Sequence, residues 1–281
     1  MENNEVIVKE KSNKGLIIII VILTIIVLGL AGYLVYDKFI AKTPTPQTTD
    51  NTNSNAVDNT TTNDTKKVLK KDESKDVVYT EISAGKHRVP QINIDSETAT
   101  KFNQEIMSFY DGFKKGEGLA ASYTEYDFGY KYYINDEIVS IVVSHTTESG
   151  AENPTKVYNI NQYTGKEVTK TELLAKANID ESQFSSKLIA SYKKIDSWDK
   201  IMEEINTMPT NMRDAELNFK KGVYDGNINK LSQNDFIGLY LNNNQIYVIF
   251  DMNTYAGAGH QQTILNMSNN TIQNVGSVII N

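Results

Sequence analysis

The longest apolar pattern in the chain is an uncharged run over residues 16–36, LIIIIVILTIIVLGLAGYLVY. As an α-helix these 21 residues extend about 31 Å, which is enough to cross a hydrocarbon layer about 30 Å thick. The run is longer than the apolar region of a secretory signal peptide, and no small-x-small cleavage site follows it. We therefore predict a retained transmembrane signal-anchor helix over residues 16–36.

Basic residues are slightly more frequent before this run than after it. Three lysines precede it and two follow it: Lys9, Lys11, Lys14, Lys38 and Lys42. Because cytoplasmic flanks carry the excess of basic residues, residues 1–15 are predicted to be a short cytoplasmic tail. The expected location is the cell membrane, crossed once, with about 245 residues on the extracytoplasmic side.

Large apolar residues almost disappear between residues 37 and 75. This segment is rich in Thr and Asn, has prolines near its start and has a basic end. Such a composition cannot offset the conformational entropy that ordering would cost. We predict a disordered linker that tethers a folded domain over residues 76–281.

After residue 76, apolar residues recur in short stretches, some with the spacing of a helix and others with the spacing of a strand. Residues 102–113 carry apolar side chains at helical spacing after a possible N-cap at Asp95 or Ser96, and Thr169 and Glu172 have capping-box spacing. A longer helix or helix pair is predicted over residues 182–206, whereas residues 208–232 allow no assignment. Strands are predicted at 77–82, 89–94, 120–134, 138–147, 156–163, 236–241, 245–251 and 262–267. This order predicts an α+β fold with helices packed on a mostly antiparallel sheet.

The net charge of the predicted domain restricts the classes of molecule that it can bind. Residues 76–281 contain 18 Lys and Arg against 26 Asp and Glu, a net charge of −8. Such an acidic domain would repel nucleic acid and could attract a cationic protein. The alternative is that the net negative charge only keeps the domain soluble. The chain has no cysteine, which excludes disulfides and thiolate metal sites.

Sequence motifs for catalysis are weak. The three histidines form neither HExxH nor HxH, and there is no G-x-S-x-G or Walker motif. Two S-x-x-K matches begin at Ser191 and Ser197, but the K-T-G box of penicillin-binding proteins is missing. We therefore predict no catalytic residues, no metal and no cofactor, and we expect a non-enzymatic protein. A hydrolase whose acidic residues meet only in the fold remains the alternative.

The most distinctive loop joins two predicted strands over residues 251–261, DMNTYAGAGHQ. It combines small residues with an aromatic ring and a histidine, and loops on rigid sheets often carry recognition. We name Asp251, Tyr255, His260 and Gln261 as candidate ligand-binding residues. The alternative is a structural chain reversal with a bulge, which needs the same glycines.

Three stretches of the domain carry a family resemblance. They are EIVSI at 137–141 with a second strand ending NQYTGK at 161–166, TELL at 171–174, and IYVIFD at 246–251 continued by YAGAG at 255–259. In pattern and order they resemble the extracytoplasmic domain of RsiV-type anti-sigma factors, which is shared with the N-terminal region of PdaC-type peptidoglycan deacetylases. The resemblance spans roughly residue 77 to the C-terminus. It implies a membrane-tethered α+β module outside the cell, which in RsiV-type members binds lysozyme.

The chain departs from both relatives in what surrounds this module. Its predicted tail of 15 residues leaves no room for a sigma-binding segment, and it lacks a deacetylase domain. We therefore expect an RsiV-like binding or sensor domain of a Gram-positive cell envelope, without anti-sigma activity. The expected ligand is a cationic protein such as lysozyme or a wall glycan. The alternatives are a cell-wall-modifying hydrolase and a structural envelope protein whose partner is another membrane protein.

Overall fold

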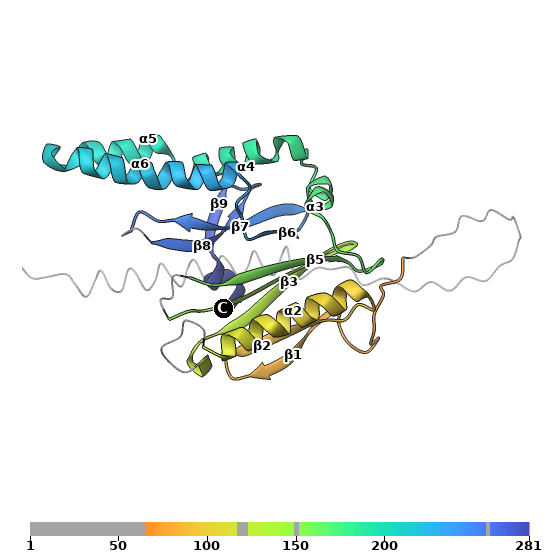
Figure 1. The fold of residues 1–281 in the computed structure, drawn as a ribbon. Helices are drawn as coiled ribbons and strands as arrows, with labels where there is room; N and C mark the ends of the chain where they lie inside the picture. The colour runs from red at the N-terminus through yellow and green to blue at the C-terminus, as the bar shows by residue number, and fades with distance from the viewer. Residues whose placement is uncertain (1–65, 117–122, 149–151, 257–258, 281) are drawn as a thin grey trace, which may run out of the picture. The chain divides into compact units, whose positions relative to one another are not determined.

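A computed structural model describes residues 66–116, 123–148, 152–256 and 259–280 (Figure 1). They belong to one compact unit, residues 64–281. The predicted tail, the predicted signal-anchor helix at 16–36 and most of the predicted linker lie outside these described residues. Within them, none of the helices combines the length and the apolar character needed to span a membrane.

The elements follow the predicted alternation of strands and helices. The first half contains β1 (Val78–Ala84), β2 (His87–Ile92), α2 (Glu97–Lys114), β3 (Phe128–Asn135), β4 (Ile138–His145) and β5 (Thr155–Asn161). The middle is helical, with α3 (Lys170–Lys176), α4 (Glu181–Ile195), α5 (Trp198–Thr207) and α6 (Thr210–Ser232). The last part contains β6 (Gly238–Asn242), β7 (Gln245–Asn253), β8 (His260–Asn266), β9 (Thr271–Asn274) and a π-helical turn, η2 (Gly276–Ile280).

The strands form two sheets that lie face to face between two layers of helix (Figure 1). The first sheet has the order β1-β2-β3-β4-β5 and is antiparallel except where His87 meets Phe128 between β2 and β3. The second sheet, β6-β7-β8-β9, is antiparallel throughout. The predicted α+β class with mostly antiparallel strands is confirmed, but the strands divide between two sheets where one was expected.

Each interface between layers has its own apolar cluster. Phe102 and Ile106 of α2 pack on the outer face of the first sheet, and Leu188 of α4 packs with Phe250 on the outer face of the second. Val142 of β4 lies in a third cluster between the sheets. Strand β4 is therefore buried on both faces, which explains why its sequence IVSIVVSH lacks the alternation of a half-buried strand.

Polar side chains of the first sheet hydrogen-bond to the backbone of β6. Asn159 Nδ2 donates to the Leu239 carbonyl (2.9 Å), and Asn135 Nδ2 donates to the Leu241 carbonyl (2.9 Å). The Leu241 amide donates to Ser140 Oγ (3.1 Å). Strand β6 lies at the edge of its sheet, so the backbone groups on one of its sides have no neighbouring strand. These hydrogen bonds give those backbone groups partners and fix the spacing of the two sheets.

Two predicted helix starts are confirmed by their caps. Ser96 Oγ accepts from the Ala99 amide (3.1 Å) at the start of α2. Before α3, the Thr169 amide donates to Glu172 Oε2 (2.7 Å), and the Glu172 amide donates back to Thr169 Oγ1 (3.3 Å). The predicted helix or helix pair is a pair, α4 and α5, which separates at Asp196 and Ser197.

The packed part of the chain includes residues of the expected linker. The Asp95 amide donates to the Leu69 carbonyl (2.7 Å), and the Leu69 amide donates to the Gln162 carbonyl (2.9 Å). Asn93 Nδ2 also donates to the Asp72 carbonyl (2.7 Å). These bonds place residues 69–72 against the domain, on the N-terminal side of residue 76.

Candidate functional site

The four candidate residues lie at the loop end of the β7–β8 hairpin, but they form two separate pairs. Asp251 belongs to β7, His260 and Gln261 begin β8, and Tyr255 lies in the connection. Asp251 and His260 bond to each other in a charged cluster. Tyr255 and Gln261 instead line a pocket beside the end of α4.

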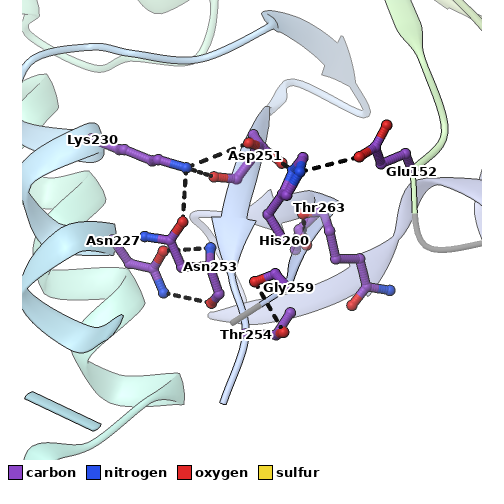
Figure 2. A network of polar contacts seen from close by, with 10 residues as sticks. Glu152, Asn227, Lys230, Asp251, Asn253, Thr254, Gly259, His260 and Thr263 are labelled. Atoms are coloured by element: carbon purple, nitrogen blue, oxygen red, sulfur yellow. Dashed lines mark hydrogen bonds and ion pairs between the residues drawn. The ribbon is translucent and has the colours of Figure 1, made fainter. Parts of the chain in front are cut away.

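The charged cluster alternates acidic and basic groups (Figure 2). Asp251 lies between Lys230 of α6 and His260, whose Nδ1 is 2.7 Å from Asp251 Oδ1. On its other side, His260 Nε2 is 3.1 Å from Glu152 Oε1. Lys230 Nζ donates to the Asp251 carbonyl (2.7 Å) and to Asn253 Oδ1 (3.1 Å), and lies 3.4 Å from Asp251 Oδ2. The cluster thus connects α6, the β7–β8 hairpin and the segment before β5.

The surroundings of His260 favour its protonated form. The hydrogen bond to Asp251 and the charge of that carboxylate raise the pKa of His260, and Glu152 adds to this effect. Partial desolvation and the charge of Lys230 oppose it. As the imidazolium ion, His260 donates from both ring nitrogens to the two carboxylates. Every charged group in this cluster already has a partner, which is typical of a structural contact that holds α6, the hairpin and the segment before β5 together.

The His260 contacts should make stability depend on pH near neutrality. Because the pKa of His260 is raised in the folded state, its contribution is complete below the unfolded value of about 6.5 and is lost as pH rises through the folded value. The ring is half exposed, so solvent screening should limit the change to about 1 kcal/mol or less.

An NMR titration of the histidine ring protons measures this directly. We expect His260 to titrate above 6.5 and Asp251→Asn to lower its pKa. His145 provides an internal reference, because burial lowers its pKa. The interpretation is wrong if His260 titrates at or below the pKa of His145.

The second pair belongs to a pocket of about 450 Å³ between the end of α4 and the β7–β8 connection. Its lining residues come from α4 and its C-cap, β7, the connection, β8 and β9: Tyr192, Ile195, Asp196, Met252, Asn253, Thr254, Tyr255, Ala256, Gln261 and Ile272. A volume of this size is typical of small-ligand pockets, which span about 300–1,000 Å³.

A hydrogen-bond network holds one carboxylate in this pocket. Tyr255 OH donates to Asp196 Oδ2 (2.6 Å), and Tyr192 OH donates to the same oxygen (2.5 Å). Asn227 Nδ2 of α6 in turn donates to Tyr192 OH (2.9 Å). Burial, and then the bond to Asp196, raises the pKa of both tyrosines, so both hydroxyls remain donors at neutral pH. The carboxylate is thus oriented by two fixed donors.

Sequence reasoning identified Tyr255 and Gln261 but missed Asp196 and Tyr192. Tyr255 and Asp196 are 59 positions apart, and no local pattern indicates that they meet. One weak signal was present, because Asp196 directly follows α4, and a carboxylate at the negative end of a helix dipole is unfavourable without compensation. The two tyrosine hydroxyls provide that compensation.

Among all the described residues, no three His, Cys, Asp or Glu side chains are grouped so that they could hold a metal ion. Ser191, the first residue of an S-x-x-K match, is buried in α4 at 3% exposure. The candidate residues thus contribute to two arrangements, the pocket beside Asp196 and the cluster around His260. In comparisons with known proteins, no family model matches the sequence, and no curated protein or solved structure is significantly similar to it.

Proposed function

We propose that this chain is a membrane-anchored binding protein of a bacterial cell envelope, whose extracytoplasmic domain recognises a basic protein such as lysozyme. The observation that carries the proposal is the excess of carboxylates in residues 76–281, which gives a net charge of −8. Several described lysines already pair with carboxylates, among them Lys114, Lys176 and Lys220. Opposite net charges steer two proteins together and raise the association rate.

The position of the candidate loop supports recognition at the β7–β8 end of the domain. Tyr255 and Gln261 extend from a hairpin whose β7 strand is held by its neighbours in the sheet and by Asn227 and Lys230 of α6. A rigid sheet that presents a loop beside a pocket is a common arrangement of binding sites. The predicted anchor over residues 16–36 would tether the domain to the membrane.

A basic protein fits this site better than a wall glycan does. Sugar recognition needs several hydrogen-bonding groups around each ring, whereas the accessible surface of this pocket is mainly apolar, with Ile195, Met252 and Ile272 among its lining residues. The pocket also presents a single carboxylate, while glycoside hydrolysis uses a pair. The proposal is therefore a binding function without catalysis.

Isothermal titration calorimetry of the full chain in a mild detergent tests this function. We expect lysozyme to bind with measurable heat at low salt and with at least tenfold lower affinity at 0.15 M salt, because the Debye length shortens from about 30 Å at 0.01 M to about 8 Å. An acidic protein of similar size is the control and should not bind. Absence of heat with lysozyme at low salt would contradict the proposal.

A further inference from the structure

We propose that the pocket beside Asp196 receives a primary ammonium group at the end of an apolar stem, supplied by a lysine side chain of the basic partner. The inference deepens the proposed function and rests on it for the source of the lysine. Asp196 is the one acidic residue among the described residues that line this pocket of about 450 Å³. The other charged and polar groups then decide which cation fits.

The pocket has its negative charge in a fixed position. Both tyrosine hydroxyls donate to Asp196 Oδ2, and among the described residues no hydrogen bond or ion pair is made to Asp196 Oδ1. The partial negative charge of the C-terminus of α4 adds to that of the carboxylate. The nearby ammonium of Lys220, 5.8 Å from the centre of the Tyr255 ring, pairs with Glu204 (2.7 Å). A cation is therefore favoured here, and Lys220 is held by another partner.

The walls suit an aliphatic stem. Ile195, Met252 and Ile272 line the pocket together with the two tyrosines. Two polar lining residues make bonds of their own, since Asn253 Oδ1 accepts from Lys230 (3.1 Å) and Thr254 Oγ1 donates to the Gly259 carbonyl (3.2 Å). A ligand with one charged end and an apolar body matches this arrangement. Long basic side chains bury their methylene stems on apolar surface in this way.

The hydrogen bonds to Asp196 favour lysine over arginine. A guanidinium binds a carboxylate most strongly through two parallel bonds, one to each oxygen. In this pocket Oδ2 already accepts from both Tyr192 and Tyr255, so a bidentate pair would compete with them. An ammonium is a compact point charge that needs only Oδ1.

Methyl NMR on the full chain with ¹³C-labelled methionine methyl groups provides the direct test. Met252 lines the pocket, whereas Met212 on α6 is 54% exposed and is not a lining residue. The probe is N-acetyl-lysine methylamide, compared with the corresponding norleucine and arginine compounds. We expect a saturable shift of the Met252 signal with the lysine probe, at least tenfold weaker binding of the neutral norleucine probe, intermediate binding of arginine, and no shift of Met212.

A pair of matched variants then assigns the effect to one carboxylate. Asp196→Asn keeps the shape of the side chain and should weaken binding of the lysine probe at least tenfold. Asp199→Asn removes the same charge from an exposed position at the start of α5 and should change it less than twofold. Because the lysine and norleucine probes are compared on the unmodified chain, the test does not depend on how well a variant folds.

The outcomes separate this inference from the proposed function. Equal binding of the lysine and norleucine probes, or no effect of Asp196→Asn in a folded variant, would overturn the pocket assignment. If lysozyme still bound in that case, the proposed function would stand without it. A Met252 shift with the lysine probe in a chain that does not bind lysozyme would support the pocket chemistry and refute lysozyme as the partner.

Discussion

Replacing Asn227 with alanine should lower the free energy of unfolding by about 2–4 kcal/mol, the largest effect that we predict for a single polar side chain. Asn227 is 0% exposed and joins α6 to the end of β7. Its Nδ2 donates to the Asn253 carbonyl (3.0 Å) and to Tyr192 OH (2.9 Å), while its Oδ1 accepts from the Asn253 amide (2.8 Å). Alanine would leave these groups without their partner, and each unsatisfied buried group costs about 1–3 kcal/mol.

Urea unfolding followed by the fluorescence of Trp198, the only tryptophan, measures this effect. Trp198 packs against Tyr224 of α6 (ring centres 5.2 Å apart), so its emission reports on the helices concerned. Asn229→Ala is the matched control, because Asn229 is exposed on the same helix. It should change the free energy of unfolding by no more than about 0.5 kcal/mol. Similar values for the two variants would show that the network around Asn227 contributes little.

The elements that sequence reasoning found are those whose signals are local. Ser96 and Thr169 start helices because their side chains cap amides three residues later, within the same stretch of sequence. The hairpin of β6 and β7 follows from Asn243 and Asn244, which adopt φ values of 50° and 57° at the turn. Such positive φ values are disfavoured for most residues and are adopted more often by asparagine.

The α6 helix was missed because its sequence has almost no apolar periodicity. Met212 and Phe219 in its first half are exposed, and only Val223, Tyr224 and Leu231 in its second half are buried apolar residues. A helix that is half surrounded by solvent gives no continuous stripe, so its position depends on packing against α4 and α5. The division into two sheets was missed for a related reason, since it depends on contacts between distant segments. One signal was available, because β4 lacks alternation and so must be covered on both faces.

The candidate site was predicted in part. The β7–β8 loop was identified from its composition, and Tyr255 and Gln261 do line a pocket. Asp251 and His260 instead pair with each other outside that pocket, which the sequence did not indicate. Their separation follows from the geometry of the hairpin, because neighbouring strand residues such as His260 and Gln261 point to opposite faces. One face of this sheet packs on helices and the other on the first sheet, and the tertiary fold decides which layer covers each face.

The packing of the two sheets against each other leads to the second prediction, for Gly238 in β6. A Cβ atom at this position would lie 2.7 Å from Val157 Cβ of the first sheet. Since Cβ of a β-branched residue cannot move without its backbone, alanine would have to push the sheets apart. That movement would strain the bonds of Asn159 and Ser140 to the neighbouring residues of β6. We expect Gly238→Ala to lower the free energy of unfolding by about 1–3 kcal/mol, as overpacked cores do.

Gly222→Ala is the matched substitution with the opposite expected sign. Gly222 lies in α6, and an added Cβ atom there would meet nothing within 4 Å. Alanine restricts the unfolded chain and favours the helix, so the free energy of unfolding should rise by about 0.5–1 kcal/mol. The same urea titration compares both variants with the unmodified chain. If the two glycines respond alike, the close approach of β6 to Val157 is not what fixes the distance between the sheets. Opposite signs would instead show that β6 is held against the first sheet tightly enough that a single methyl group separates them.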